Sequence, residues 1–220
     1  MRRIRVLPRR REVDGQRRPL PAVSYRPPRQ QLSVIVSALN DSIRIVPTLL
    51  TLQPLRAEGH EVVLVDGGSS DDTVELAREL VDQVIEGPPE GRRRMNLGAR
   101  RAWGETLLFL RPGCLLPDGA DRQIFSALEG GEWGCFRVRA AGNGPLLRIV
   151  ESLAGWGARM VGAPPPEDGL FLRRGLYERM GGFPEPPDAG PAPIGRRLRR
   201  VGRPVFPCGA LLTTGETAAR

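Results

Sequence analysis

The sequence predicts an α/β fold with a mostly parallel, Rossmann-like β-sheet at its centre and helices on both faces. Short apolar segments typical of buried parallel strands recur at 32–39, 62–65 and 106–110. Segments with apolar residues at helical spacing lie between them, and clusters of glycine, serine and proline mark the turns. Strands and helices that alternate in this way form a parallel sheet covered on both sides.

The first thirty residues are predicted to be a disordered basic arm. All 33 basic residues of the chain are arginines, and residues 1–30 hold 10 of them against Glu12 and Asp14. The arm therefore has a net charge of +8, and residues 31–220 have a net charge of zero. It lacks apolar periodicity and is rich in proline. Residues 31–220 are expected to form a single domain, because their number fits one α/β core.

The first strand is expected at Leu32–Leu39, and Asn40-Asp41-Ser42 supplies the cap of the helix that follows. Apolar residues follow helical spacing in this helix, at Ile45, Leu49, Leu52 and Leu55. Pro47 and Pro54 lie within it, so we predict that the helix is short or kinked.

The segment Glu61–Thr73 contains a strand that ends at Asp66, a Gly-Gly-Ser-Ser turn, and the start of a helix expected at about 72–81. A carboxylate at the carboxyl end of a parallel strand, beside glycines and the N–H groups of a helix start, is typical of nucleotide sites in open α/β sheets. The alternative is structural: Asp66 caps the turn and Asp71 caps the helix.

The rest of the chain continues the alternation and then becomes less regular. Further strands are expected at 83–86, 106–110, 133–140, 170–174 and near Val205. Residues 91–99 are expected to be a loop entering a helix that ends at Gly104, and further helices are expected at 118–128, 145–161, 177–182 and 194–201. The 145–161 helix is amphipathic, so it either packs on the sheet or lies on a membrane.

Composition argues against several classes of protein. The charge lies on the arm and not on the folded body, and no recognition helix with interleaved aromatics is visible, so we expect no nucleic-acid partner. No apolar run approaches the roughly 20 residues that span a bilayer. Cys114, Cys135 and Cys208 lack the paired spacing of a disulfide framework or a zinc site. We expect a cytoplasmic protein, with peripheral contact at the inner membrane surface as a further possibility.

Six short motifs, taken in order, resemble family 2 glycosyltransferases, in particular the short soluble bacterial branch. They are Ser33-Val34-Ile35-Val36 with Asn40, Val65–Thr73, Gly91-Arg92 with Met95-Asn96 and Gly98-Ala99, Leu108–Leu110, Phe171–Arg174, and Gly181–Pro184. The resemblance covers residues 32 to about 210. It implies a GT-A fold, in which a Rossmann-like nucleotide half and an acceptor half share one continuous sheet.

The resemblance also implies a nucleoside diphosphate sugar as donor and an inverting transfer to a hydroxyl acceptor. Asp66, with Gly67 beside it, would lie at the base or ribose of the donor, because a buried carboxylate that accepts from a ring N–H or a hydroxyl orients the nucleotide. Ser37 and Asn40 would border the same base. Arg92 and Arg94 would lie near the diphosphate, although in so arginine-rich a chain they equally fit a solvated helix start.

The first departure from the family concerns the metal. The family places acidic ligands for Mg²⁺ or Mn²⁺ after the 106–110 strand, whereas this chain has Arg111-Pro112-Gly113-Cys114. Hard divalent cations need oxygen ligands, which these side chains do not supply. We therefore expect no metal cofactor, with Arg111 and Arg92 neutralising the leaving diphosphate through guanidinium–phosphate pairs.

The second departure concerns the catalytic base. The family's acidic pair falls on Gly190 and Pro191, neither of which can take a proton. Glu167 and Asp168 are the nearest candidates for a shifted base, and Glu185 and Asp188 are also within a loop's reach. The alternative for all four is that they are solvated loop charges. The alternative is a catalytically inactive homologue that serves as a nucleotide-binding, protein-binding or membrane-binding module.

Overall fold

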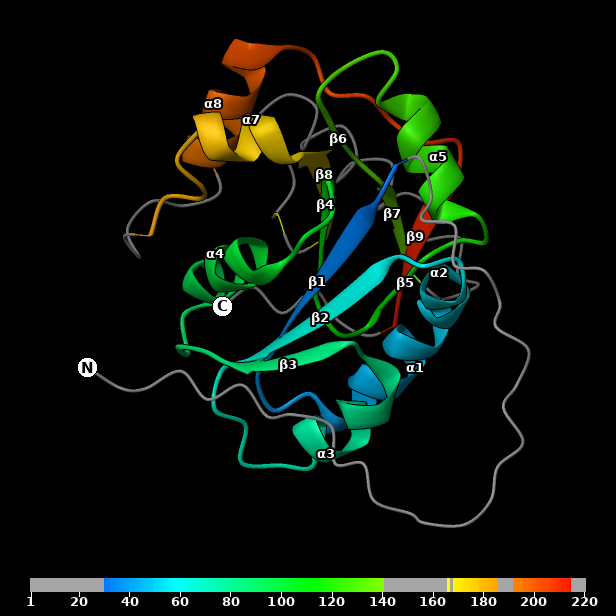
Figure 1. The fold of residues 1–220 in the computed structure, drawn as a ribbon, viewed down its shortest axis with the longest axis vertical. Helices are drawn as coiled ribbons and strands as arrows, with labels where there is room; N and C mark the ends of the chain where they lie inside the picture. Colours follow the sequence, from blue (N-terminus) through cyan, green and yellow to red (C-terminus); the bar gives the residue numbers. More distant parts are fainter. Residues whose placement is uncertain (1–29, 141–165, 167, 186–191, 215–220) are drawn as a thin grey trace.

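The computed structural model describes residues 30–140, 166, 168–185 and 192–214, and a six-stranded sheet forms its centre (Figure 1). The strand order is β3-β2-β1-β4-β8-β6. These strands are β1 (Leu32–Ala38), β2 (Glu61–Asp66), β3 (Gln83–Glu86), β4 (Thr106–Leu110), β6 (Trp133–Cys135) and β8 (Asp168–Arg173). The first four are parallel, and β8 is antiparallel to both β4 and β6. The prediction of a mostly parallel α/β sheet is confirmed.

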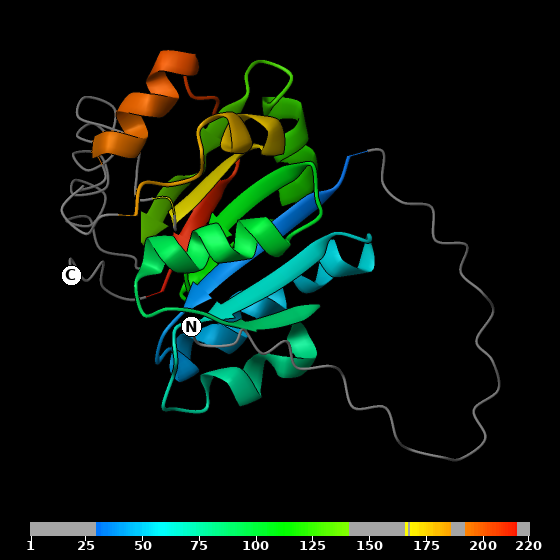
Figure 2. The ribbon, with the colours of Figure 1, turned by 60° about the vertical axis from the view of Figure 1, so that its left-hand side comes forward.

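Helices cover both faces of the sheet, because successive side chains of the buried strands point to opposite sides. On one side, apolar residues of β1, β2 and β4 pack against α1 (Ser42–Thr51), α2 (Gln53–Ala57), α3 (Thr73–Ala77), η1 (Arg78–Leu80) and α5 (Ala120–Ala127). On the other side they pack against α4 (Gly91–Arg101), α7 (Arg174–Arg179) and α8 (Ala192–Val201). Figure 2 shows α4 lying across this second face, with α7 and α8 on the same side.

The close approach of α4 to the sheet depends on a glycine. A Cβ added at Gly98 would lie 2.5 Å from Cγ2 of Ile35 on β1 and 2.9 Å from Cγ2 of Val65 on β2. Real Cβ contacts are longer than this, so any larger residue would push the helix away. Gly98 thereby sets the distance between the carboxyl-terminal half of α4 and the strands β1 and β2.

Several boundaries differ from the sequence predictions. The helix expected after the first strand is interrupted at Leu52, just before Pro54, which confirms the predicted break. The strand expected at 133–140 divides at Phe136, and its second part, β7 (Arg137–Ala140), joins a separate sheet of order β5-β9-β7 with β5 (Cys114–Leu115) and β9 (Ala210–Thr213).

The last strand was predicted in the wrong place. Val205 forms only an isolated bridge to Gly134, because Pro204 and Pro207 on either side of it have no N–H to donate to a ladder. The strand β8 begins at Asp168, earlier than expected, and α7 begins at Arg174, three residues before the predicted helical turn. The arm and the helix predicted at 145–161 lie outside the described residues.

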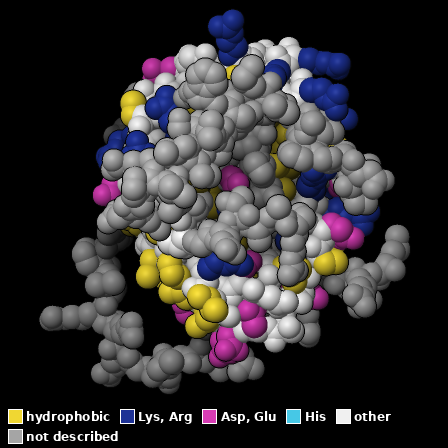
Figure 3. All heavy atoms as spheres, turned by 180° about the vertical axis from the view of Figure 1, so that it is seen from behind, with side chains coloured by type: hydrophobic (Ala, Val, Ile, Leu, Met, Phe, Trp, Pro, Cys, Tyr) yellow, Lys and Arg dark blue, Asp and Glu magenta, His cyan; other side chains and the backbone are white. Residues whose placement is uncertain are grey.

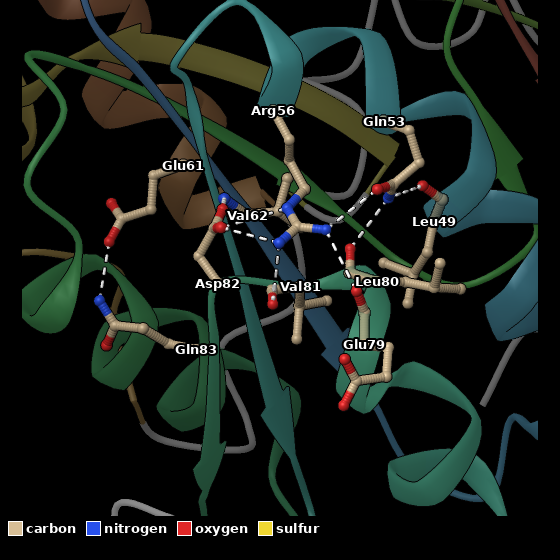
Figure 4. A network of polar contacts seen from close by, with 10 residues as sticks. All are labelled: Leu49, Gln53, Arg56, Glu61, Val62, Glu79, Leu80, Val81, Asp82 and Gln83. Atoms are coloured by element: carbon tan, nitrogen blue, oxygen red, sulfur yellow. Dashed lines mark hydrogen bonds and ion pairs between the residues drawn. The ribbon is translucent and has the colours of Figure 1, made fainter. Parts of the chain in front are cut away.

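Arg56 on α2 joins the helices on the first face to the edge of the sheet (Figure 4). Its Nε and Nη2 atoms donate to Oδ1 of Asp82, at 3.1 and 2.9 Å. The guanidinium also donates to Gln53 and to the carbonyl oxygens of Glu79 and Val81. Oδ2 of Asp82 in turn accepts from the backbone N–H of Val62, at 2.9 Å. One guanidinium therefore satisfies the acceptors between η1 and β3.

We expect Arg56→Ala to lower the free energy of unfolding by about 2 kcal/mol, because it leaves Asp82 and two carbonyl groups without their charged donor. Urea denaturation followed by circular dichroism would measure the change. Arg78→Ala is the matched control, since Arg78 is exposed on the neighbouring η1; its effect should stay within about 0.5 kcal/mol. Equal effects of the two substitutions would contradict the role given to Arg56.

Candidate functional site

The carboxyl ends of β1, β2 and β4 meet at one edge of the sheet, because these strands are adjacent and parallel. Most of the residues predicted to bind a nucleotide follow these ends. Ser37 and Asn40 belong to the end of β1 and its loop, Asp66 and Gly67 to the end of β2, and Arg111 to the end of β4. The topology therefore gathers the predicted residues along one edge.

Asp66 is buried, at 5% exposure, and its carboxylate organises the turn that follows β2. Its Oδ2 accepts from the backbone N–H groups of Gly68 and Ser69, at 2.9 and 2.8 Å. Its Oδ1 accepts from Oγ of Ser69 at 2.5 Å. The structural alternative is therefore real: Asp66 caps its own turn. A carboxylate has about four acceptor positions, so these three bonds leave one on Oδ1 for a further donor.

Asn40 joins the loop after β1 to the turn after β2. Its φ of 54° places it in the left-handed region, the only such non-glycine residue in the described part of the chain. Asparagine tolerates this conformation better than most residues. Its backbone N–H donates to Oγ of Ser69 at 2.8 Å, and its Oδ1 accepts from the N–H of Ser70 at 2.8 Å. The two loops are thus fixed to each other.

Asp71 makes a second connection between the same loops. Its carboxylate accepts from the backbone N–H groups of Ser42 and Thr73, each at 3.1 Å, and from Oγ1 of Thr73 at 2.5 Å. The hydrogen bond from the Thr73 hydroxyl is the main reason why the pKa of Asp71 falls to about 2, and the bonds from Ser42 and from the Thr73 backbone add to it. Asp71 is therefore held as a charged carboxylate at the start of α3.

Arg94 lies under the turn after β2 and is buried, which contradicts the alternative of a solvated helix face for this residue. Its Nε donates to Oγ of Ser37 at 2.8 Å, and its Nη1 donates to the carbonyl oxygen of Pro89. A Cβ at position 67 would collide with this Nη1, so a larger residue there would require the guanidinium to move. Three predicted site residues, Ser37, Gly67 and Arg94, are in contact.

Arg111 and Asp168 form an ion pair between β4 and β8. Nε of Arg111 lies 2.5 Å from Oδ1 of Asp168, and the two side chains are only 22% and 10% exposed. The pair follows from the register, because Asp168 is the cross-strand partner of Leu110. The carboxylate predicted as a base is therefore bound to the arginine predicted to contact phosphate. Glu167, Asp188, Gly190 and Pro191 lie outside the described residues.

Asn96 is a residue to which sequence reasoning gave no role. Its Oδ1 accepts from the Tyr177 hydroxyl at 2.6 Å and from the N–H of Phe183 at 2.9 Å. Its Nδ2 donates to the carbonyl oxygen of Phe183 at 2.9 Å and to Oε1 of Glu185 at 3.1 Å. Burial raises the pKa of Tyr177, which keeps its hydroxyl protonated as a donor.

This asparagine therefore ties α4 to the segment after α7 and holds one carboxylate, Glu185, on the same side of the sheet. Arg93 contacts that carboxylate as well, with 3.7 Å between Nε and Oε2. The signal in the sequence was an asparagine among the apolar positions of a helix, where a buried amide needs several partners. Those partners are 81, 87 and 89 residues away along the chain, so the sequence did not reveal them.

Residues 33–132 match the profile of Glycosyl transferase family 2. This part of the chain belongs to that family. The solved structures described next share this fold, and the prediction of a GT-A fold is confirmed. Among curated protein sequences, none matches the chain.

Solved structures of family 2 glycosyltransferases resemble this one at low sequence identity. S. aureus TarS 1–349 in complex with UDP has a TM-score of 0.63 at 18% identity, over 84% of this chain and 61% of TarS. Mannosyltransferase PcManGT from Pyrobaculum calidifontis, in complex with GDP-Man and Mn²⁺, has a TM-score of 0.60 at 21% identity, over 90% of this chain and 59% of PcManGT.

Glucosyl-3-phosphoglycerate synthase from Mycobacterium tuberculosis, in complex with phosphoglyceric acid, has a TM-score of 0.58 at 17% identity. That match covers 86% of this chain and 73% of the synthase. The chain spans about three fifths of the length of TarS 1–349 and PcManGT. At these identities the likeness shows the fold alone.

The residues of this family 2 domain do not fit the divalent metal that the resemblance implies. The segment Arg111–Cys114 after β4 has no carboxylate, and Asp168, which lies beside it, is bound to a guanidinium. A hard cation would need oxygen ligands at this place. The expectation that the protein uses no metal stays a prediction.

A second group of possible metal ligands lies at the opposite edge of the sheet, where Glu58, His60 and Asp121 approach one another. Nδ1 of His60 accepts from the N–H of Leu32 at 3.3 Å, so the neutral ring carries its proton on Nε2. Nε2 lies 3.5 Å from Oδ2 of Asp121 and has no hydrogen-bond partner. A protonated Nε2 has no lone pair for a metal, so this cluster does not fit one either.

The low pKa of Asp71 predicts a pH dependence of stability. Its folded pKa lies below its ordinary value of 3.8, so the ionised group stabilises the fold at neutral pH. That contribution is lost as the pH falls from about 4 to about 2. We expect Asp71→Asn to be less stable than the native chain at about pH 7, and we expect this difference to be smaller at about pH 2.5, as measured by urea denaturation.

Asp72→Asn serves as the control, because Asp72 is an exposed neighbour. It should leave the difference between the two pH values unchanged. If Asp71→Asn lost the same free energy of unfolding at both pH values, the stabilisation would not come from the ionised carboxylate.

Proposed function

We propose that the protein binds a nucleoside diphosphate sugar at the carboxyl edge of β1, β2 and β4 and transfers the sugar, with inversion, to a hydroxyl acceptor. In this proposal the guanidinium of Arg111 takes the place of a divalent cation at the diphosphate. The observation that carries it is the ion pair between Arg111 and Asp168, at 2.5 Å, at the end of β4.

Support for a nucleotide donor comes from the comparisons and from the loops. TarS and PcManGT have this fold and have been solved with UDP and with GDP-Man. In this chain, Asn40 and Asp71 fix the loops after β1 and β2, so little order has to be gained on binding. The remaining acceptor position on Oδ1 of Asp66 suits a base N–H or a ribose hydroxyl.

Arg111 has the chemistry that a diphosphate leaving group requires. A guanidinium is charged at all physiological pH values, and its planar fork pairs with phosphate oxygens. Charge that develops on the leaving diphosphate is stabilised best by a cation that is already fixed in position. Asp168 fixes the guanidinium of Arg111 by accepting a hydrogen bond from its Nε. Arg92 at the start of α4 is the second proposed phosphate contact.

The pairing changes the role proposed for Asp168. A general base needs an accessible carboxylate within hydrogen-bond reach of the acceptor hydroxyl. The carboxylate of Asp168 is 10% exposed and bound to Arg111, so we assign it the positioning of that arginine. Glu167 remains the candidate base.

The ion pair also favours a second function, that of a catalytically inactive nucleotide-binding protein, because it engages one of the two candidate bases, Asp168. If Glu167 does not reach the acceptor, the site binds a donor without transferring its sugar, and the protein acts as a nucleotide-binding partner of another enzyme. Incubation with a radiolabelled donor separates the two: transfer to an added acceptor or to water supports the enzyme, and binding without turnover supports the inactive homologue.

Isothermal titration with UDP and with GDP tests the role of Arg111. The native chain should bind one of the two equally well with Mn²⁺ and with EDTA. Arg111→Ala should weaken that binding about 10- to 100-fold, because a charge-assisted contact is worth about 1.5–3 kcal/mol. Arg111→Asp places two carboxylates side by side, so its binding should be weak in EDTA and recover with Mn²⁺.

Arg100→Ala is the control, since Arg100 is exposed in the last turn of α4. Its affinity should equal that of the native chain. Binding by the native chain that requires Mn²⁺, or an Arg111→Ala variant with unchanged affinity, would overturn the proposal.

A further inference from the structure

Positive charge on the described part of the chain is concentrated in one segment. Residues 192–214 hold five arginines and no acidic residue. The other described residues hold 15 arginines against 19 acidic residues. Arginine is frequent throughout the chain, but in the other described residues acids outnumber it, so compositional bias alone does not account for this segment.

Three of these arginines lie on one side of α8. Arg196, Arg199 and Arg200 have the spacing i, i+3 and i+4, which places them on one face of the helix, and Arg203 follows just beyond its end. All four are exposed. We call these four residues the α8 basic face. Seen from behind, arginine side chains gather at the upper right of the molecule, the corner where α8 lies (Figure 3).

The opposite side of α8 is anchored in the core. Ile194 and Leu198 are buried against the second face of the sheet. The indole Nε1 of Trp133 on β6 donates to the carbonyl oxygen of Gly202 at 3.1 Å and so fixes the end of the helix. The α8 basic face is therefore presented outward by a rigid element, and its arginines cannot turn inward without unpacking the core.

Apolar side chains stand exposed next to this charge. Val201 at the end of α8 is 44% exposed, and Phe206 is 41% exposed. The guanidinium of Arg137 lies 5.9 Å from the centre of the Phe206 ring, which extends the positive surface to β7. Arg139 and Leu212 are register partners on β7 and β9, and both are exposed.

We propose that the α8 basic face docks the protein on the surface of an anionic lipid bilayer. Several arginines held on one rigid face attract the negative headgroup layer, and neighbouring apolar side chains add contact at its boundary. Polynucleotides are a poorer match, because α8 (192–201) carries no aromatic side chain on which bases could stack. No helix in the described ranges is long and apolar enough to cross a membrane, so the contact is with the surface.

Sedimentation with phosphatidylglycerol or phosphatidylcholine vesicles tests the proposal on the full chain. The native protein should pellet with the anionic vesicles, not with the neutral ones, and salt should release it because these exposed charges are screened. Replacing the four arginines of the α8 basic face by glutamine should weaken binding at least tenfold, since each arginine near the surface contributes about fivefold. Replacing the same four by lysine should retain it.

The control carries the same change of charge elsewhere. It replaces four exposed arginines on other elements by glutamine: Arg78, Arg100, Arg101 and Arg122. Because the basic arm is present in every variant, a difference between the two glutamine variants reports on α8 alone. Thermal unfolding of each variant shows whether arginines at the end of α8 only support its helix dipole.

Three results would overturn the proposal: no pelleting of the native chain with anionic vesicles, an equal loss in both glutamine variants, or α8-dependent binding to RNA with none to vesicles. A loss confined to the α8 variant, in a protein with native thermal stability, supports it.

Discussion

The ion pair between Arg111 and Asp168 connects the two halves of this molecule. Arg111 follows β4, the last strand of the parallel, nucleotide-type half, and Asp168 opens β8, the antiparallel strand that begins the other half. A buried carboxylate without a partner is costly, so Asp168 depends on this guanidinium. Their pairing takes up the carboxylate closest to the end of β4 and places a fixed cation there. The rest of the proposed chemistry depends on this arrangement.

Around this pair the loops are rigid before any ligand arrives. Asn40, Asp71 and Asp66 use their side chains to satisfy the backbone N–H groups of the turns after β1 and β2. Such self-capping has two consequences: it makes the loops a structural unit, and it leaves few polar atoms for a ligand. In the proposed function, the remaining acceptor position of Asp66 meets the nucleotide, and the guanidinium of Arg111, with Arg92 as the second contact, meets its diphosphate.

The sequence predicted the parallel part of the fold well, because β1, β2 and β4 are continuous apolar segments whose pattern depends on few long-range contacts. It predicted less of the second half. Phe136 divides an apparently continuous strand because its two parts pair in different sheets, and Val205 cannot extend a ladder between two prolines. For the site, the residue types were enough to predict which side chains lie at the carboxyl ends of the parallel strands. The partner of Asp168 and the four hydrogen bonds of Asn96 were not predicted, because they involve residues distant in sequence.

A crystal structure of the chain grown with UDP or GDP and Mn²⁺, with data collected at the manganese absorption edge, tests the central claim most directly. The account predicts a diphosphate within hydrogen-bond distance of the Arg111 guanidinium, the Arg111–Asp168 pair intact, and no anomalous peak between the phosphates and the end of β4. An anomalous peak at that position, coordinated by the diphosphate and by protein oxygens, would contradict it.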